Sequence, residues 1–154
     1  MPSIEQLIRQ SKFRDEKHKA IISILYTANV LNSFHEKYLS QFNLTSQQYN
    51  TLRILRGQHP QPATINLIRE RMMDKMSDAS RIVERLRKAG FVERVTNKTD
   101  RRSVDVLITQ KGLDVLAEID AHSLIIDSPT KNLTQEEAKE LGCLLGKMID
   151  ALVE

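Results

Sequence analysis

One predicted helix, over residues 76–89, gathers hydroxyl and cationic side chains on one side. At about 100° of rotation per residue, Ser77, Arg81 and Lys88 point in one direction together with Glu84. Short serine hydroxyls can approach base edges or phosphates closely, and an arginine can donate two hydrogen bonds to guanine O6 and N7. On a helix that fits a major groove about 12 Å wide, these residue types indicate contact with duplex DNA. The residues expected at such a groove are Ser77, Ser80, Arg81 and Arg85.

The first turn of this helix also carries Asp78, whose charge opposes that of DNA. Asp78 therefore either stabilises the helix dipole or orients Arg81. Taken alone, the helix is more typical of an amphipathic element whose charged side only faces water. Its aliphatic residues fill a sector about 120° wide that we expect to be buried, namely Met76, Ala79, Ile82, Val83 and Leu86.

A polar hexamer, residues 97–102, joins two predicted strands and exceeds the roughly two to five residues that a structural hairpin connection needs. It carries Lys98, Arg101 and Arg102. Arginine at such a tip can enter the narrow, electronegative minor groove. We expect Asp100 to brace the loop by contacting Arg102 or a backbone N–H. The cationic loop beside the helix favours nucleic-acid binding over a merely solvated face.

Hydrophobic periodicity and capping signals place the helices around this pair. One long helix is expected over residues 16–42. A second follows Leu44, with Thr45 and Gln48 at capping-box spacing, and ends near Gly57. A third is expected over residues 63–73, with Thr64 as N-cap, and Gly90 stands where a left-handed C-cap would end the helix at 76–89.

The period then changes from helical to two, which predicts strands over residues 91–96 and 103–108. Thr109 is expected to cap a helix that runs to about Ser128, and a capping box of Thr134 and Glu137 opens the last helix. The fold class is therefore mostly α with a small β-hairpin wing. This is a winged helix-turn-helix with additional N- and C-terminal helices.

Charge is distributed unevenly along the 154 residues. Residues 69–102 carry 11 basic and 6 acidic side chains, whereas residues 103–154 carry 4 and 10. A basic middle and an acidic end suggest that the middle faces a polyanion, although charge also fluctuates along any chain. No run of 18 apolar residues occurs, so no membrane-spanning helix is expected.

The sequence lacks the residue patterns of several kinds of functional site. The single Cys143 excludes an intrachain disulfide, and no secretory signal is recognisable, which favours the cytoplasm. We interpret Cys143 as a small buried apolar residue rather than a redox sensor. The four histidines show no metal-ligand spacing, and no phosphate loop or nucleophile motif occurs. We therefore expect no metal, no cofactor and no enzyme activity.

Three segments resemble the MarR family of transcription regulators. Residues 74–94 are similar to its recognition helix, residues 97–103 and 106–112 to its wing and the following helix start, and residues 44–55 to its second helix. The resemblance implies a two-fold dimer, a palindromic operator, Arg101 as the minor-groove arginine and Ser77, Ser80 and Arg81 at the major groove. It also implies that a small, often anionic aromatic effector can release DNA.

Surplus apolar residues in the terminal helices predict a homodimer independently of that resemblance, because a winged helix already closes its own core. Residues 1–42 and 113–154 are expected to dimerise, and residues 43–112 to bind DNA. Gly142 and Gly146 either admit a close helix from the partner or merely weaken the last helix. The leading hypothesis is a sequence-specific repressor; the alternative is an interaction module that kept the fold but lost DNA binding.

Overall fold

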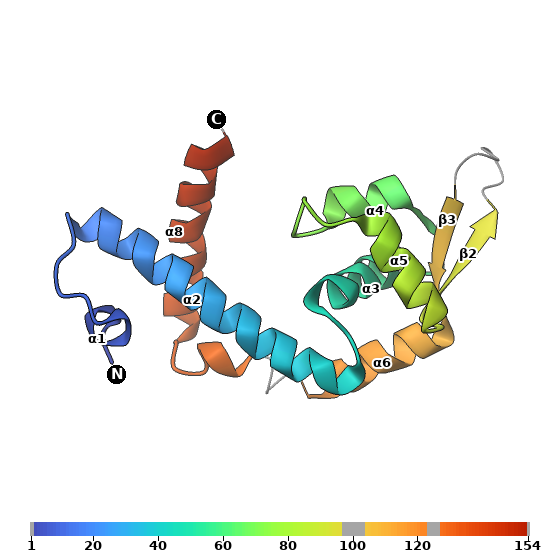
Figure 1. The fold of residues 1–154 in the computed structure, drawn as a ribbon, viewed down its shortest axis with the longest axis horizontal. Helices are drawn as coiled ribbons and strands as arrows, with labels where there is room; N and C mark the ends of the chain where they lie inside the picture. Colours follow the sequence, from blue (N-terminus) through green and yellow to red (C-terminus); the bar gives the residue numbers. More distant parts are fainter. Residues whose placement is uncertain (1, 97–103, 123–126, 154) are drawn as a thin grey trace. The chain divides into compact units, whose positions relative to one another are not determined.

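The computed structural model describes residues 2–96, 104–122 and 127–153 and is mostly helical (Figure 1). It divides into two compact units, a larger one that ends at Ala117 and a smaller one that begins at Glu118. The larger unit contains every described element from helix α1 to the start of helix α6. All the residues that were predicted to contact DNA and that the structure describes belong to this larger unit.

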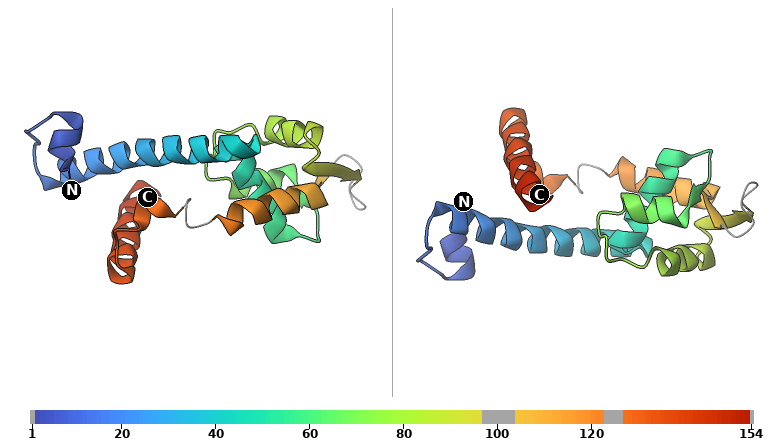
Figure 2. Two further views of the ribbon diagram at one scale, coloured as in Figure 1. Left: turned by 90° about the horizontal axis from the view of Figure 1, so that it is seen from below. Right: turned by 90° about the horizontal axis from the view of Figure 1, so that it is seen from above.

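The N-terminal part of the larger unit is a short helix α1 (Ile4–Ile8) followed by the long helix α2 (Glu16–Leu39). An ion pair of 2.5 Å between Lys19 Nζ and Glu5 Oε1 joins them. A 3-10 turn η1 (Ser40–Phe42) continues α2, so the helix predicted over 16–42 is confirmed. Within this unit α2 extends away from the helices that surround the sheet (Figures 1 and 2).

Helix α3 (Ser46–Gln58) begins with the predicted capping box: Gln48 N–H donates to Thr45 Oγ1, and Thr45 N–H donates to Gln48 Oε1. Helix α4 (Ile65–Arg71) has Thr64 as N-cap, as predicted, but it is shorter than the expected 63–73. Ala63 and Thr64 instead form strand β1, which pairs with residues 105 and 106. A two-residue strand is too short to show an alternating pattern, so periodicity merged it with the helix.

The wing strands are β2 (Val92–Thr96) and β3 (Val104–Ile108), which pair antiparallel from Val92↔Ile108 to Thr96↔Val104. This confirms the predicted hairpin. With β1 added on the other side of β3, the described sheet has three strands in the order β1-β3-β2. Fully buried aliphatic residues of α3, α4, α5 (Ala79–Lys88) and β3 form the core of this lobe, including Leu52, Leu55, Ile68, Val83, Leu86 and Val106.

Helix α6 (Gln110–Ala121) starts at the predicted cap, since Gly112 N–H donates to Thr109 Oγ1 at 3.2 Å. It ends at Ala121 and does not run to Ser128 as predicted, and Ser128–Thr130 form a separate 3-10 turn, η2, that contains Pro129. Proline lacks the N–H that a continuing helix would need. Residues 123–126 lie outside the described residues.

The last helix, α8 (Gln135–Val153), opens with the predicted capping box of Thr134 and Glu137. Its apolar residues are largely exposed in the single chain. Cys143 is exposed as well, so the interpretation as a buried apolar residue is wrong for this chain alone. Burial was inferred from residue type, which cannot show whether a helix face has a partner within the same chain.

Candidate nucleic-acid interface

The entry to α5 differs from the prediction, because the helix begins at Ala79 and not at Met76. Asp74 organises the preceding turn: its carboxylate accepts hydrogen bonds from Met76 N–H at 3.0 Å and from Ser77 Oγ at 2.6 Å. Asp side chains compete with helical hydrogen bonding in this way. The hydrogen bond from the Ser77 hydroxyl, and to a smaller extent the one from Met76 N–H, keeps the pKa of Asp74 below its ordinary value.

This turn corrects two expectations about its residues. Met76 was expected in the buried sector of the helix, but 93% of it is exposed. Ser77 lies in the turn before α5 rather than on the helix, and its hydroxyl donates to Asp74. Ser77 remains next to the N-terminus of α5, where free backbone N–H groups favour a phosphate.

The remaining amphipathic pattern of α5 is confirmed. Ala79, Val83 and Leu86 are buried, and Ile82 is half-buried. On the outward side Ser80, Arg81 and Arg85 are exposed. The helix therefore presents polar side chains to its surroundings while its aliphatic side packs in the core, which is the arrangement that a groove-binding helix needs.

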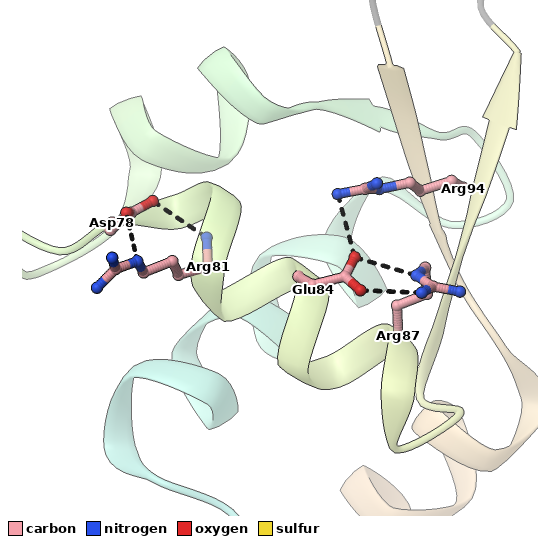
Figure 3. A network of polar contacts seen from close by, with 5 residues as sticks. All are labelled: Asp78, Arg81, Glu84, Arg87 and Arg94. Atoms are coloured by element: carbon pink, nitrogen blue, oxygen red, sulfur yellow. Dashed lines mark hydrogen bonds and ion pairs between the residues drawn. The ribbon is translucent and has the colours of Figure 1, made fainter.

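The sequence left two roles open for Asp78, stabilising the start of the helix and orienting Arg81, and the structure shows both. Asp78 is the N-cap of α5, accepting a hydrogen bond from Arg81 N–H at 3.0 Å. Its other oxygen lies 3.5 Å from Arg81 Nε (Figure 3). The Arg81 side chain is nevertheless 82% exposed. Asp78 therefore orients one edge of the Arg81 guanidinium, and the rest of the group is accessible from solvent.

Glu84 holds two arginines that the sequence did not assign to it (Figure 3). Arg87 donates from Nε to Oε2 at 3.1 Å and from Nη2 to Oε1 at 2.9 Å, and Arg94 Nη2 lies 3.3 Å from Oε2. The hydrogen bonds from Arg87 keep the pKa of Glu84 low and raise that of Arg87. The spacing of Glu84 and Arg87 could have signalled their pair, whereas Arg94 comes from β2.

The C-terminal end of α5 is fixed by the start of α6. Gly90, with φ of 79°, is the left-handed residue that the sequence predicted. Lys111 Nζ donates to the carbonyl of Ala89 at 2.7 Å, and Thr109 Oγ1 donates to that of Gly90 at 2.8 Å. A cation and a hydroxyl thereby satisfy carbonyls that a helix end leaves without partners. Thr109 and Lys111 thus hold the C-terminal end of α5 against the start of α6.

The predicted wing residues Lys98, Asp100, Arg101 and Arg102 lie outside the described residues. Their segment joins Thr96 to Val104, which are partners at the end of the β2–β3 ladder. Beside the ladder, an open depression of about 570 Å³ is lined by Arg87, Gly90, Val92, Glu93, Arg94 and Thr109. In the part of the chain that the structure describes, no group of three or more potential ligands could hold a metal ion.

A model of the MarR family matches residues 44–104, from two residues before α3 to the first residue of β3. The HTH-type transcriptional regulator MgrA of Staphylococcus aureus is 27% identical over 139 residues, which cover 90% of this chain and 92% of MgrA. Residues 44–104 thus match a MarR-family domain, and the relatives support the resemblance to MarR-family transcriptional regulators. The chain is a DNA-binding transcriptional regulator, and the expectation that it is not an enzyme is confirmed by its relatives.

Solved MarR-family structures share this fold. A mutant of E. coli MarR complexed with operator DNA is 26% identical, covers 90% of this chain and 99% of its own, and has a TM-score of 0.74. The organohalide-sensing regulator RdhR in its 2,4-dichlorophenol-bound form is 17% identical, covers 98% and 89%, and has a TM-score of 0.78; at that identity the likeness concerns the fold alone. Among the described residues, none of the helices is long and apolar enough to cross a bilayer.

Proposed function

We propose that this chain is a MarR-family repressor that binds a palindromic operator as a homodimer and is released by a small molecule. The arrangement of α5 carries the proposal. Its aliphatic side is buried, whereas Ser80, Arg81 and Arg85 are exposed on the outward side. Arg81, oriented by Asp78, is the residue that we assign to base reading, and Ser77 and Ser80 are assigned to phosphates or base edges.

The wing supplies the second contact in this proposal. Thr96 and Val104 close the β2–β3 ladder, and the chain between them contains Lys98, Arg101 and Arg102. We assign Arg101 to the minor groove, Lys98 and Arg102 to phosphates, and Asp100 to bracing the loop.

Dimerisation through residues 1–42 and 113–154 is supported by exposed aliphatic side chains on both terminal helices. On α2 these are Ile21, Leu25 and Val30, and on α8 they are Leu141, Leu144, Ile149 and Leu152. Apolar surface of this extent is typical of an interface. A two-fold pair of residues 43–112 would read two half-sites about 34–36 Å apart, which is why we expect a palindrome.

The proposed effector is a small aromatic anion. A regulator of the same fold, RdhR, has been solved with 2,4-dichlorophenol bound, which supports a small aromatic ligand; that the ligand is an anion rests on the family resemblance alone. Addition of such compounds to a preformed complex should release DNA at concentrations that leave the melting temperature of the DNA unchanged.

Selection of duplexes from a random library by the full chain tests the proposal, followed by titration of the selected operator at fixed salt. Arg81→Ala should reduce discrimination against a single altered base pair by about 1–3 kcal/mol. Arg101→Ala should weaken binding while the dimer persists. Arg14→Ala, which removes an exposed arginine between α1 and α2, is the control and should bind as wild type. Unchanged affinity in both test variants would favour the interaction-module alternative.

A further inference from the structure

By helical position Glu84, which is half-buried, shares the side of α5 that carries Arg81 and Lys88, where bound DNA would bring more negative charge. Two guanidinium groups approach it from different elements: Arg87 from α5, at 2.9 and 3.1 Å, and Arg94 from β2, at 3.3 Å (Figure 3). Both oxygens are therefore engaged. A negative charge at this position would repel bound DNA. The presence of Glu84 here therefore calls for a functional explanation.

The geometry around Glu84 is that of an anion site. Guanidinium groups donate paired hydrogen bonds to carboxylates and to phosphates in the same manner. The Glu84 side chain is 32% exposed and the two arginine side chains are each 45% exposed, so a ligand can reach them. Arg87 and Arg94 also line the open depression beside β2. An ion pair so accessible to water is held weakly and can exchange partners.

We propose that Arg87 and Arg94 form a binding site for a backbone phosphate of duplex DNA, and that the Glu84 carboxylate occupies this site while DNA is absent. This inference rests on the proposed function and deepens it. Glu84 acts as an internal competitor: a phosphate replaces its carboxylate at one or both arginines when DNA binds. Because phosphates carry no sequence information, the competition lowers affinity for every duplex.

Glu84→Gln tests the competition, because glutamine keeps the shape of the side chain and removes its charge. Glu93→Gln is the matched control, since Glu93 lines the same depression but does not hold the two arginines. Affinity for a duplex unrelated to the operator is measured over a range of NaCl concentrations. We expect Glu84→Gln to bind several-fold more tightly than Glu93→Gln. Because the carboxylate no longer neutralises part of the positive charge at the site, the plot of log K against log salt for Glu84→Gln should be steeper than that for Glu93→Gln, by up to about 0.9.

Arg94→Gln provides a second variant that does not depend on Glu84→Gln, and it should make the slope shallower than that of wild type by about 0.9. Equal affinities and slopes for Glu84→Gln and Glu93→Gln would overturn the inference. Weaker binding by Glu84→Gln would also overturn it, because the carboxylate would then be needed to position the arginines.

Failure of the phosphate site and failure of the proposed function give different results. A wild-type chain that binds no duplex would defeat the proposed function itself, whereas normal binding with unchanged slopes defeats only the phosphate site. To distinguish the DNA backbone from free phosphate, inorganic phosphate alone is titrated into Glu84→Gln by calorimetry in chloride buffer. No saturable binding at millimolar phosphate is expected. Saturation that Arg87→Gln abolishes would show that the site takes free phosphate rather than the DNA backbone.

Discussion

The carboxylate of Asp78 contacts Arg81 twice, accepting from its backbone N–H at 3.0 Å and lying 3.5 Å from its Nε. The first contact caps α5 and the second orients the guanidinium. Replacing Asp78 by Ala removes both, and loss of an N-cap costs about 0.5–2 kcal/mol of stability. Asp78→Asn keeps a capping oxygen and loses the ion pair. Urea unfolding should therefore separate the two variants, with Asn close to wild type.

The DNA affinities of these two variants complete that test. Both should bind DNA with less dependence on base sequence, because Arg81 is no longer oriented. If Asp78→Asn proved as unstable as Asp78→Ala, the cap would depend on the charge of the carboxylate. If both variants kept full sequence discrimination, orientation by Asp78 would not matter for reading.

Gly112 in α6 lies against Phe91, which links α5 to β2, and against Ile108 at the end of β3. A Cβ at this position would overlap the carbonyl oxygen of Phe91 and lie 2.7 Å from Cγ1 of Ile108. Gly112→Ala should therefore lower the free energy of unfolding by at least about 1–3 kcal/mol. At Gly57 in α3, no heavy atom of the described residues lies within 4 Å of such a Cβ, apart from the chain neighbours and the nearby backbone of α3 itself. Gly57→Ala should instead stabilise the chain by about 0.5–1 kcal/mol.

Thermal unfolding of the two alanine variants beside wild type makes this comparison. Because Gly112 is where α6 meets the end of α5, Gly112→Ala should also weaken operator binding at temperatures where the variant is still folded. A stable Gly112→Ala with normal DNA binding would mean that the contact between Gly112 and Phe91 is not needed to hold the recognition helix.

Local signals in the sequence were sufficient for most of the helix ends and for the wing ladder. Capping residues such as Thr45, Thr64 and Thr134 act within three residues, so their spacing reveals them. Contacts between distant segments left no such trace. The pairing of Ala63 with Val106, the ion pair of Arg94 with Glu84 and the turn organised by Asp74 depend on tertiary packing or on competition between side-chain and helical hydrogen bonds.

Met76 and Met72 test the corrected entry to α5. Met76 is almost fully exposed in the turn, whereas Met72 at the end of α4 is 1% exposed. Met72→Ala should destabilise the chain by about 2–5 kcal/mol through the cavity that it leaves. Met76→Ala should change the free energy of unfolding by less than about 0.5 kcal/mol. If urea unfolding showed comparable losses of unfolding free energy for the two variants, Met76 would be buried, as the sequence first predicted.

Glu5 and Lys19 make the contact between α1 and α2 dependent on pH. The hydrogen bond from Lys19 lowers the pKa of Glu5 to about 2, and the same contact raises the pKa of Lys19. A carboxyl whose pKa is depressed by folding stabilises the fold above its ordinary value, near 4.5, and loses that contribution as the pH falls towards 2. The contact should therefore persist at neutral pH and weaken within this acidic window.

Carbon NMR titration of the Glu5 carboxyl group measures this directly. In wild type the resonance should titrate near pH 2, and in Lys19→Met it should move back towards its ordinary value because the main donor is gone. Titration of wild-type Glu5 near pH 4.5 would show that α1 does not rest against α2 through this pair.

Leu144 is an exposed member of the aliphatic stripe of α8, and it offers the sharpest test of the proposed dimer. Leu144→Glu would place a charge without a partner in an apolar interface, so it should raise the dissociation constant of the dimer by well over tenfold. Lys139→Gln changes the net charge equally from the opposite side of α8 and should leave the dimer intact. Sedimentation velocity over a range of concentrations distinguishes these results. If both variants stayed dimeric at the concentrations where wild type does, α8 would not be part of the interface, and the exposed stripe would require a different partner.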